Sequence, residues 1–457
     1  MPQPERPVCK LRTMDASKRS GTRARCLRPG RIAAVLFLLL PLAATAQISL
    51  SSAIDLAEKN STSVRGAVAN VQKATAVLAE TRDAYIPTFL VGSSVGYAYG
   101  FPLGYPSFFT ASSQSLVLSW SQKDYTRAAR AGVNSANLNL KDVQQQVALD
   151  VAQDYVELDY DLKEIAALEQ EIGYAESLVE IEQDRVQAGV DPRMDQLQAE
   201  LTAAQVDEKR IHLENDANAM RQKLAHLTGL PATGLTTVSA SIPPAPAADS
   251  LAQSGENTAF SNPGVSAAYA NAKAKLYSAF GDARQNYRPL VSFGAQYALF
   301  EKTADYSEYF QKFQYNNVEF GAQITFPLFD ATRRAKGHES AADAVHAQAD
   351  ADAALDILNE QTSTMRDTTR ELAAQQRVAQ VRSQIAQDQL KTIETELTNG
   401  TGTPNAPIPP TEAQKARIEE RERYADVLDG DFSLLKVELN LLRATGQLDA
   451  WVRSSLK

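Results

Sequence analysis

The side chains that most often carry catalysis or bind metals are few and scattered in this chain. Outside the first 46 residues it has four histidines, and the closest two are eight residues apart, which is not a metal-binding spacing: His212, His226, His338 and His346. No phosphate-binding loop, nucleophile elbow or Cys/His cluster occurs. The charged run at 419–423 is interpreted as a solvated helix face with local ion pairs. We therefore expect no enzyme activity, no cofactor and no metal site.

Residues 1–46 have the pattern of an export signal. Arg28 and Arg31 precede an apolar run at 32–40, and the triplet 44–46, Ala-Thr-Ala, has the small-x-small pattern that signal peptidases cut. A membrane anchor is the alternative interpretation, but about 15 apolar residues are too few to span a bilayer comfortably. The pattern favours a signal peptide that is removed.

Removal of this segment limits the partners of the mature chain. Cys9 and Cys26 both lie in it, so no cysteine remains for a disulfide, a thiolate metal site or an N-terminal lipid. The whole chain has a net charge of −9, and the signal takes away nine Lys or Arg against only Glu5 and Asp15. A mature chain this acidic is not expected to bind nucleic acid. Since no later apolar run approaches 18 residues, we expect that it can span a membrane only as a closed barrel.

The rest of the chain contains one unit twice. Asn60 begins a stretch that ends at Pro87, and Asn262 begins one that ends at Pro289, an offset of 202 residues. At an offset of 206, four residues match four others in order: Trp120, Asp124, Thr126 and Arg127 with Phe326, Asp330, Thr332 and Arg333. The units close with Leu-Thr-Gly at 227–229 and Ala-Thr-Gly at 444–446. Several matches in one order predict a duplication.

The duplication predicts the organisation of the domains. After the signal, 1–46, we expect a first repeat at 47–229 and a second at 261–446. Residues 230–260 are rich in Pro, Ala and Ser and are expected to form an irregular linker outside any packed seam. Residues 447–457 are expected to be a C-terminal tail.

Each repeat contains two segments in which apolar residues alternate with small or polar ones. The expected apolar face carries Phe89, Val91, Val95, Tyr97 and Tyr99; then Leu116, Leu118 and Trp120, opposite Ser115, Ser119 and Ser121; then Val291, Phe293, Tyr297 and Leu299; and last Val318, Phe320, Ala322, Ile324 and Phe326. A soluble sheet with one buried face is the alternative. Lengths of about 9–14 residues, aromatic residues near the ends, and long loops at 100–113 and 302–314 favour a face exposed to lipid. The residues expected to contact lipid are Phe89, Val91, Leu118, Trp120, Phe293, Phe320, Ile324 and Phe326.

Four strands cannot close a barrel, because even the smallest need about eight. Several copies must therefore share one barrel, and three copies would supply twelve strands with an open lumen.

A very long helix without proline follows each strand pair. The first is expected at about 123–188 and the second at about 331–398, each on the order of 100 Å long. Apolar residues recur at steps of three and four, which predicts coiled-coil packing. Turns at 189–192 and 399–410 lead into return helices at 194–228 and 411–445 that are half as long. We expect helices at about 50–84 and 263–286 to pack along the remaining halves.

In its order of elements this chain resembles the TolC-type outer membrane efflux proteins. The motifs that carry the resemblance are Leu50-Ser51-Ser52-Ala53-Ile54, Ala188-Gly189 followed by 195–199, Pro327-Leu328-Phe329-Asp330 with Arg333-Arg334, and 439–446. The resemblance covers essentially the whole mature chain. It implies a membrane α+β fold, a homotrimer in which a twelve-stranded outer-membrane β-barrel continues into a periplasmic helical tunnel. Such channels serve efflux pumps or type I secretion systems, with a periplasmic adaptor and an inner-membrane transporter as partners.

The resemblance also implies that the turns at the far end of the helices contact the adaptor. The residues expected there are Gly189, Asp191, Asp195, Gly400, Pro404 and Glu412. Acidic residues near this tip can narrow the tunnel and bind cations in the family, and Asp195 and Glu412 are the nearest acids here. The second turn is six residues longer than the first and rich in proline, which we expect to alter docking or gating.

Two other classes of protein remain as alternatives. A coiled-coil protein that bridges the envelope without conducting would have such rods, but the four alternating strands would be unexplained. A periplasmic adaptor would have one helical hairpin rather than two.

Overall fold

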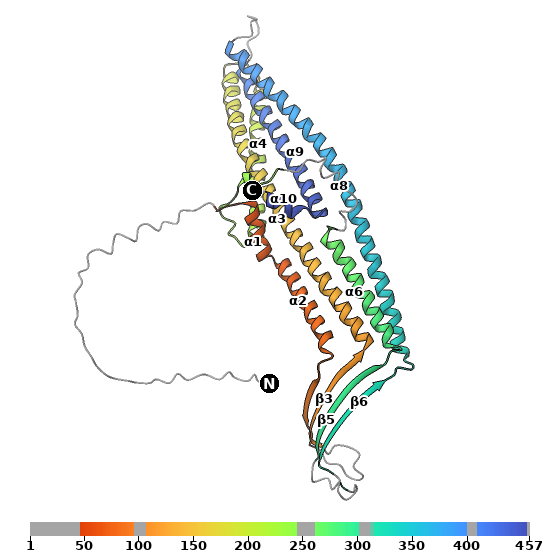
Figure 1. Cartoon of the computed structure of the whole chain (residues 1–457). Coiled ribbons are helices and arrows are strands. Elements are labelled where there is room, and N and C mark those ends of the chain that lie inside the picture. Colours follow the sequence, from red (N-terminus) through yellow and green to blue (C-terminus); the bar gives the residue numbers. More distant parts are fainter. Residues whose placement is uncertain are drawn as a thin grey trace, which may run out of the picture. The chain divides into compact units, whose positions relative to one another are not determined.

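The structure is a computed structural model that describes residues 46–95, 107–244, 261–300, 312, 314–399 and 409–454, all within the unit Thr45–Lys457. Long helices run side by side, and one four-stranded sheet continues from one end of them (Figure 1). Within the described ranges, no helix is both long enough and apolar enough to cross a lipid bilayer.

The elements occur in the same order twice. The first set is α1 (Leu50–Asn60), α2 (Thr62–Asp83), β2 (Thr88–Ser93), β3 (Ser107–Ser119), α3 (Trp120–Gln187) and α4 (Arg193–Thr228). The second set is α6 (Pro263–Gln285), β5 (Leu290–Phe300), β6 (Asn316–Thr325), α8 (Ala331–Asn399) and α9 (Pro410–Ala444). Both sets therefore contain a helix, two strands and a helical hairpin.

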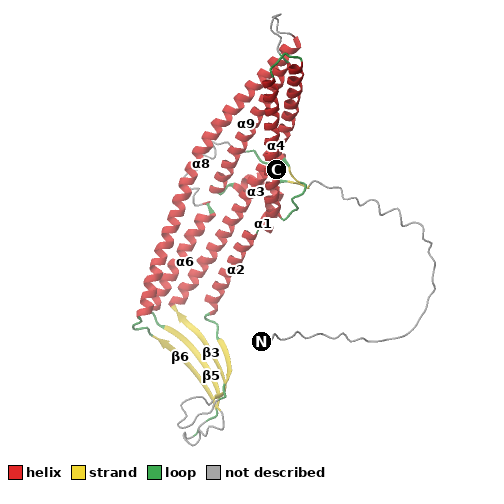
Figure 2. Cartoon of the chain, turned by 180° about the vertical axis from the view of Figure 1, so that it is seen from behind, coloured by secondary structure: helices red, strands yellow, loops and turns green. Residues whose placement is uncertain are grey.

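The two long helices, α3 and α8, have 68 and 69 residues and so are about 100 Å long. The helix α3 packs against α4 along one part and against α2 and α6 along another, while α8 packs against α9 and α6. Figure 2 shows α4 and α9 at the end far from the sheet, and α2 and α6 next to the sheet. The expectation that a further helix fills the space beyond each short return helix is confirmed.

Asparagines at matching positions make the same hydrogen bond in both sets of elements. The Asn60 side-chain amide donates to the carbonyl of Thr228 at 2.5 Å, and that of Asn262 donates to the carbonyl of Ala444 at 3.3 Å. Each carbonyl belongs to the last residue of a return helix, and a glycine in the left-handed conformation follows it one or two residues later, Gly229 or Gly446. The repeat thus preserves a contact between the end of each hairpin and an asparagine one or two residues before the helix that leads into its strands.

Replacement of Gly446 by Ala is expected to destabilise the protein by about 1–2 kcal/mol. The residue has φ 73°, and an added Cβ would lie 3.1 Å from the backbone carbonyl oxygen of Ser261. The same substitution at Gly173, which lies in α3 with open space around its Cβ position, is expected to stabilise by up to about 1 kcal/mol. Urea unfolding of both variants would check the opposite signs, and a loss of stability no greater for Gly446 than for Gly173 would contradict the prediction.

The linker expected to be irregular and outside any packed seam is in part ordered and buried. Its strand β4 (Leu235–Thr237) pairs in parallel with β1 (Ala46–Ile48), and Leu235 lies in the main apolar core. The Tyr155 hydroxyl on α3 donates to the carbonyl of Ile48 at 2.7 Å and accepts from the N–H of Val238 at 2.7 Å. That prediction was wrong for residues 235–242, because composition does not show that a short strand has a partner elsewhere in the chain.

Two further segments differ from expectation. The helix expected over 50–84 is two helices, because Ser61 has an extended backbone (φ −58°, ψ 131°). The segment expected as a C-terminal tail contains α10 (Leu448–Ser454), whose Leu448 and Trp451 are buried in the main core. This core lies near the middle of the helices and also takes in side chains of α1, α3, α4 and α9.

Candidate functional site

The first candidate surface is the sheet formed by the four long strands. They are antiparallel neighbours in the order β2-β3-β5-β6, so the pairing of β3 with β5 joins the two repeats. Within the described residues β2 and β6 each pair on one side only, and they are the edges of the sheet. Both edges therefore keep unpaired backbone donors and acceptors, which favour the addition of further strands.

One face of this sheet is apolar. Directly paired residues share a face, and the register places these side chains together: Phe89, Val91, Phe109, Ala111, Leu118, Val291, Phe293, Ala295, Tyr297, Val318, Phe320, Ala322 and Ile324. Phe320, in the middle of β6, is 75% exposed. A water-exposed sheet does not normally carry such a face.

The opposite face is polar. Its paired residues include Thr88, Thr110, Ser112, Gln114, Ser292, Gln296, Glu319, Gln323 and Thr325, with Gly92, Gly294 and Gly321 between them. Most of them line a shallow trough in the sheet. A sheet with one apolar and one polar face matches a barrel wall between lipid and a water-filled lumen.

The alternation expected for the second strand was wrong near its end. The pairing of β3 with β5 shifts between Leu116 and Leu118, so Val117 is an extra residue in a β-bulge. Leu116 consequently pairs with Ser292 on the polar face, while Ser115 pairs with Phe293 on the apolar face. Leu118 remains on the apolar face, as expected. A strict period of two cannot reveal a bulge, which exchanges the two faces beyond it.

The strand limits also differ from expectation at four places. Trp120 is the first residue of α3 rather than a strand residue, and Phe326 follows the last residue of β6. Both lie where strands meet helices, and the Arg288 guanidinium lies 5.8 Å from the centre of the Trp120 ring. The strand β2 has six residues rather than 9–14; Val95 follows it, and Tyr97 and Tyr99 lie outside the described residues. The strand β3 already begins at Ser107, inside the segment expected as a loop.

The second candidate surface is the end of the helices far from the sheet. Gly189 has φ 71° and ends α3, and Pro192 caps the start of α4. Between them, Asp191 accepts a hydrogen bond from Nη2 of Arg185 at 3.0 Å and a second from its Nε. These hydrogen bonds to Arg185 hold the pKa of Asp191 below its usual range. The first turn is thus held by an ion pair, in which Asp191 already has Arg185 as its partner.

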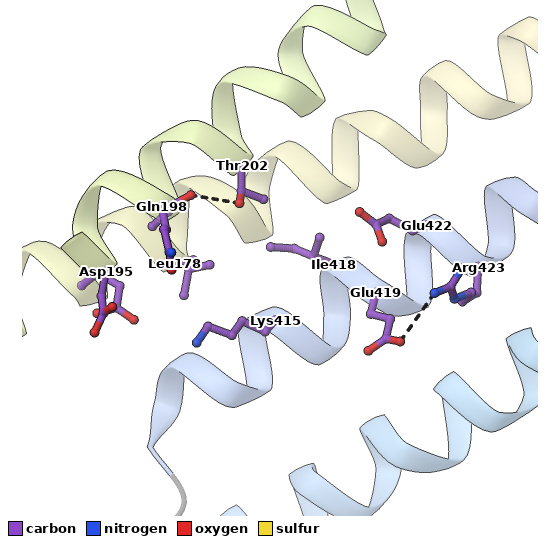
Figure 3. Close-up of a pocket in the computed structure, with 11 residues that line it drawn as sticks. Leu178, Asp195, Gln198, Thr202, Lys415, Ile418, Glu419, Glu422 and Arg423 are labelled. Atoms are coloured by element: carbon purple, nitrogen blue, oxygen red, sulfur yellow. Dashed lines mark hydrogen bonds and ion pairs between the residues drawn. The ribbon is translucent and has the colours of Figure 1, made fainter. Parts of the chain in front are cut away.

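A groove of about 330 Å³ lies beside this turn, between α3, α4 and α9 (Figure 3). Asp195 and Glu182 line it from the first repeat, and Lys415 and Glu419 line it from α9. Glu412, in the first turn of α9, pairs with Lys415 at 3.3 Å. The expected residues Gly400 and Pro404 lie outside the described part of the chain.

Buried acids along α3 and α9 are features that the sequence reasoning missed. Glu171 and Glu182 continue the spacing of the apolar seam through Leu168, Ala175 and Leu178, and all five are buried. Acidic residues at positions of the apolar repeat would have indicated these buried acids in the sequence. Burial raises the pKa of Glu171 to about 7, with the nearby Glu422 adding to the shift.

Glu438 on α9 gives a prediction about pH. It is 2% exposed, its Oε2 has no hydrogen-bond partner within the described residues, and burial raises its pKa to about 7. The folded state holds this proton more tightly than the unfolded state does, so protonation of Glu438 stabilises the folded protein. This stabilisation is complete below about pH 4.3 and is lost as pH rises through about 7. At pH 8, Glu438→Gln is expected to stabilise the protein by about 1–2 kcal/mol.

Chemical unfolding at pH 5 and pH 8 would check this prediction. The gain from Glu438→Gln should shrink at pH 5, where the wild-type carboxyl is already protonated. Glu208→Gln, on an exposed position of α4, is the matched control and is expected to change stability little at either pH. An equal effect of Glu438→Gln at both pH values would contradict the prediction.

One protein family matches part of this sequence. Residues 53–230, nearly the whole first repeat, match the family described as outer membrane efflux protein. The second repeat has the same elements in the same order. The first repeat is thus similar to the outer membrane efflux protein family.

Solved structures of outer membrane channels share the fold of this chain. The Campylobacter jejuni CmeC outer membrane channel is 15% identical with a TM-score of 0.70, over 87% of this chain and 86% of that one. The outer membrane protein VceC from Vibrio cholerae is 16% identical with a TM-score of 0.68, over 87% and 96%. The Neisseria gonorrhoeae MtrE outer membrane channel, in its open state, is 16% identical with a TM-score of 0.67, over 88% and 89%. The sequence matches no curated protein.

The family match of the first repeat and the shared fold indicate the location of the chain. It is an outer membrane protein whose helices lie in the periplasm, and its role is that of a channel in efflux. The expected resemblance to this family and the expected location are confirmed, and so is the fold class except for the closure of the barrel.

Proposed function

We propose that three copies of this chain form one channel, with a twelve-stranded barrel in the outer membrane and a helical tunnel across the periplasm. The main support for this proposal is the sheet, which has one apolar face, one polar face and, among the described residues, two edges without a neighbouring strand. Four strands per copy are too few for a closed barrel, and three copies reach a number that leaves a lumen.

The apolar face would then lie against lipid. Phe89, Val91, Leu118, Phe293, Phe320 and Ile324 share this face in the register of the sheet. Trp120 and Phe326 would lie at the boundary between lipid and periplasm, where aromatic side chains are favoured. The polar face would line the lumen.

The channel would conduct passively and take its energy from partners in the envelope. In this proposal the tip formed by Gly189, Asp191, Asp195, Gly400, Pro404 and Glu412 contacts a periplasmic adaptor, which connects it to an inner-membrane transporter of an efflux pump or a type I secretion system. The groove beside Asp195 supports this proposal, because it is an open, charged concavity next to the turn between α3 and α4 (Figure 3).

The mass of the detergent-solubilised protein, measured by light scattering, tests the assembly. Three copies are expected per particle after correction for bound detergent. A monomer under conditions that keep the helices folded would contradict it and would favour a non-conducting protein that bridges the envelope.

A deletion tests the tip. Removal of residues 403–408 from the longer second turn is expected to reduce adaptor binding and export while leaving the mass of the assembly unchanged. Unchanged export and adaptor binding would overturn the role of this turn.

A further inference from the structure

The two repeats carry a matched acid–base pair where the strands meet the long helices. In the first repeat Asp124 pairs with Arg127 at 3.2 Å, and in the second Asp330 pairs with Arg333 at 3.1 Å. Both residues of each pair are related by the same offset of 206 residues.

Among the described residues, only the first pair gains a further ion pair from another helix. Nη1 of Arg284, on α6, lies 2.6 Å from Oδ2 of Asp124, which is 1% exposed. The residue that matches Arg284 at the offset of 202 is Arg82 on α2. Arg82 is exposed and makes no ion pair with any described residue, and Asp330 is 39% exposed.

Apolar residues on α2 show the same difference. Ala270 and Ala279 of α6 are buried, at 8% and 7% exposure. The matching residues of α2 are Val68 and Val77, which have larger apolar side chains yet are 39% and 42% exposed. The helix α2 therefore carries a seam like that of α6, but part of this seam has no partner among the described residues of one copy.

The arrangement of helices explains the difference. The helix α6 lies between α3 and α8, whereas α2 contacts α3 on one side only and α8 contacts α6 without reaching α2 (Figure 1). The free sides of α2 and α8 are at opposite edges of the layer, next to the unpaired strands β2 and β6. The contact between α3 and α6 is thus absent from the second repeat of a single copy.

We propose that a second copy of this chain supplies the missing contact. The helix α8 of one copy packs on α2 of the next, as α3 packs on α6 within one copy. Asp330 then pairs with Arg82 across the interface. This proposal rests on the trimer proposed above and names the residues that join its copies. The same association brings β2 of one copy next to β6 of another, so one interface joins both the helices and the strands of neighbouring copies. Opposite charges at Arg82 and Asp330 fix the register between the copies.

Cross-linking tests the proposal, because residues 47–457 contain no cysteine. The double variant Arg82→Cys/Asp330→Cys, treated with a short bis-maleimide in detergent, is expected to give covalent dimers and trimers on a denaturing gel. Each single variant should give none. Arg65→Cys/Asp330→Cys is the matched control, because Arg65 lies on the same helix about 25 Å away.

The outcomes separate this proposal from the trimer itself. Trimers by light scattering without an Arg82–Asp330 cross-link, or with an equal cross-link in the Arg65 control, would overturn the interface and leave the trimer standing. A monomeric mass would overturn both. As a second readout, Arg82→Asp should lower the fraction of trimer about tenfold, and Arg82→Asp/Asp330→Arg should restore it to within about twofold. A double variant no better than the single one would also contradict the pairing.

Discussion

Replacement of Phe320 by Arg is expected to prevent most of the protein from inserting stably into lipid. Phe320 lies in the middle of β6, on the apolar face of the sheet, with 75% of its side chain exposed in a single copy. A guanidinium near the middle of the bilayer costs about 2–4 kcal/mol at a lipid-facing barrel position. With three copies in one barrel the cost would recur three times.

The matched control is Gln323→Arg, three residues along the same strand and on the polar face. It adds the same side chain, but towards water in the lumen, and is expected to leave insertion nearly unchanged. The measurement is the fraction of protein that resists urea extraction from vesicles. Equal loss for both variants, or no loss for Phe320→Arg, would contradict the assignment of the two faces.

Replacement of Arg284 by Met is expected to cost about 2–3 kcal/mol of stability. The Arg284 guanidinium completes the ion pair of the buried Asp124, and its loss leaves a nearly fully buried carboxylate with Arg127 as its remaining cationic partner. The loss of stability should be large because this ion pair joins α3 of the first repeat to α6 of the second.

Arg127→Met is the control for this prediction. Its side chain is 58% exposed and its ion pair with Asp124 is local to α3, so its loss is expected to cost less than about 1 kcal/mol. Thermal unfolding of the two variants in detergent, followed by circular dichroism, would compare them. A cost for Arg127→Met equal to that for Arg284→Met would show that the buried carboxylate does not depend on the second repeat.

The long helices were predictable because their ends are marked in the sequence. Gly189 and Pro192 stop one helix and start the next, and the absence of proline over the preceding 68 residues permits a single rod. The duplication was also visible, because Asn60 and Asn262 keep the same distance to the prolines that precede the strands.

The bulge at Val117 was not predictable from alternation. Apolar residues at 116, 118 and 120 read as one face, but the extra residue turns Leu116 to the polar side. A bulge depends on the register with the neighbouring strand, which the strand's own residues do not specify.

The packed part of the linker was missed for a related reason. Leu235 lies in a segment rich in Pro and Ala, yet it is buried because β4 finds β1 and the hydroxyl of Tyr155 ties both to α3. Three-residue strands are too short to show periodicity. The acids at seam positions, such as Glu171, were visible in the sequence but were read as part of the polar faces.

The most direct test of the channel is the conductance of the purified protein in planar lipid bilayers. Assemblies of three copies are expected to give discrete conductance steps, and fractions that contain only monomers should give none. A consistent absence of conductance from inserted trimers would contradict the channel and favour a protein that only bridges the envelope.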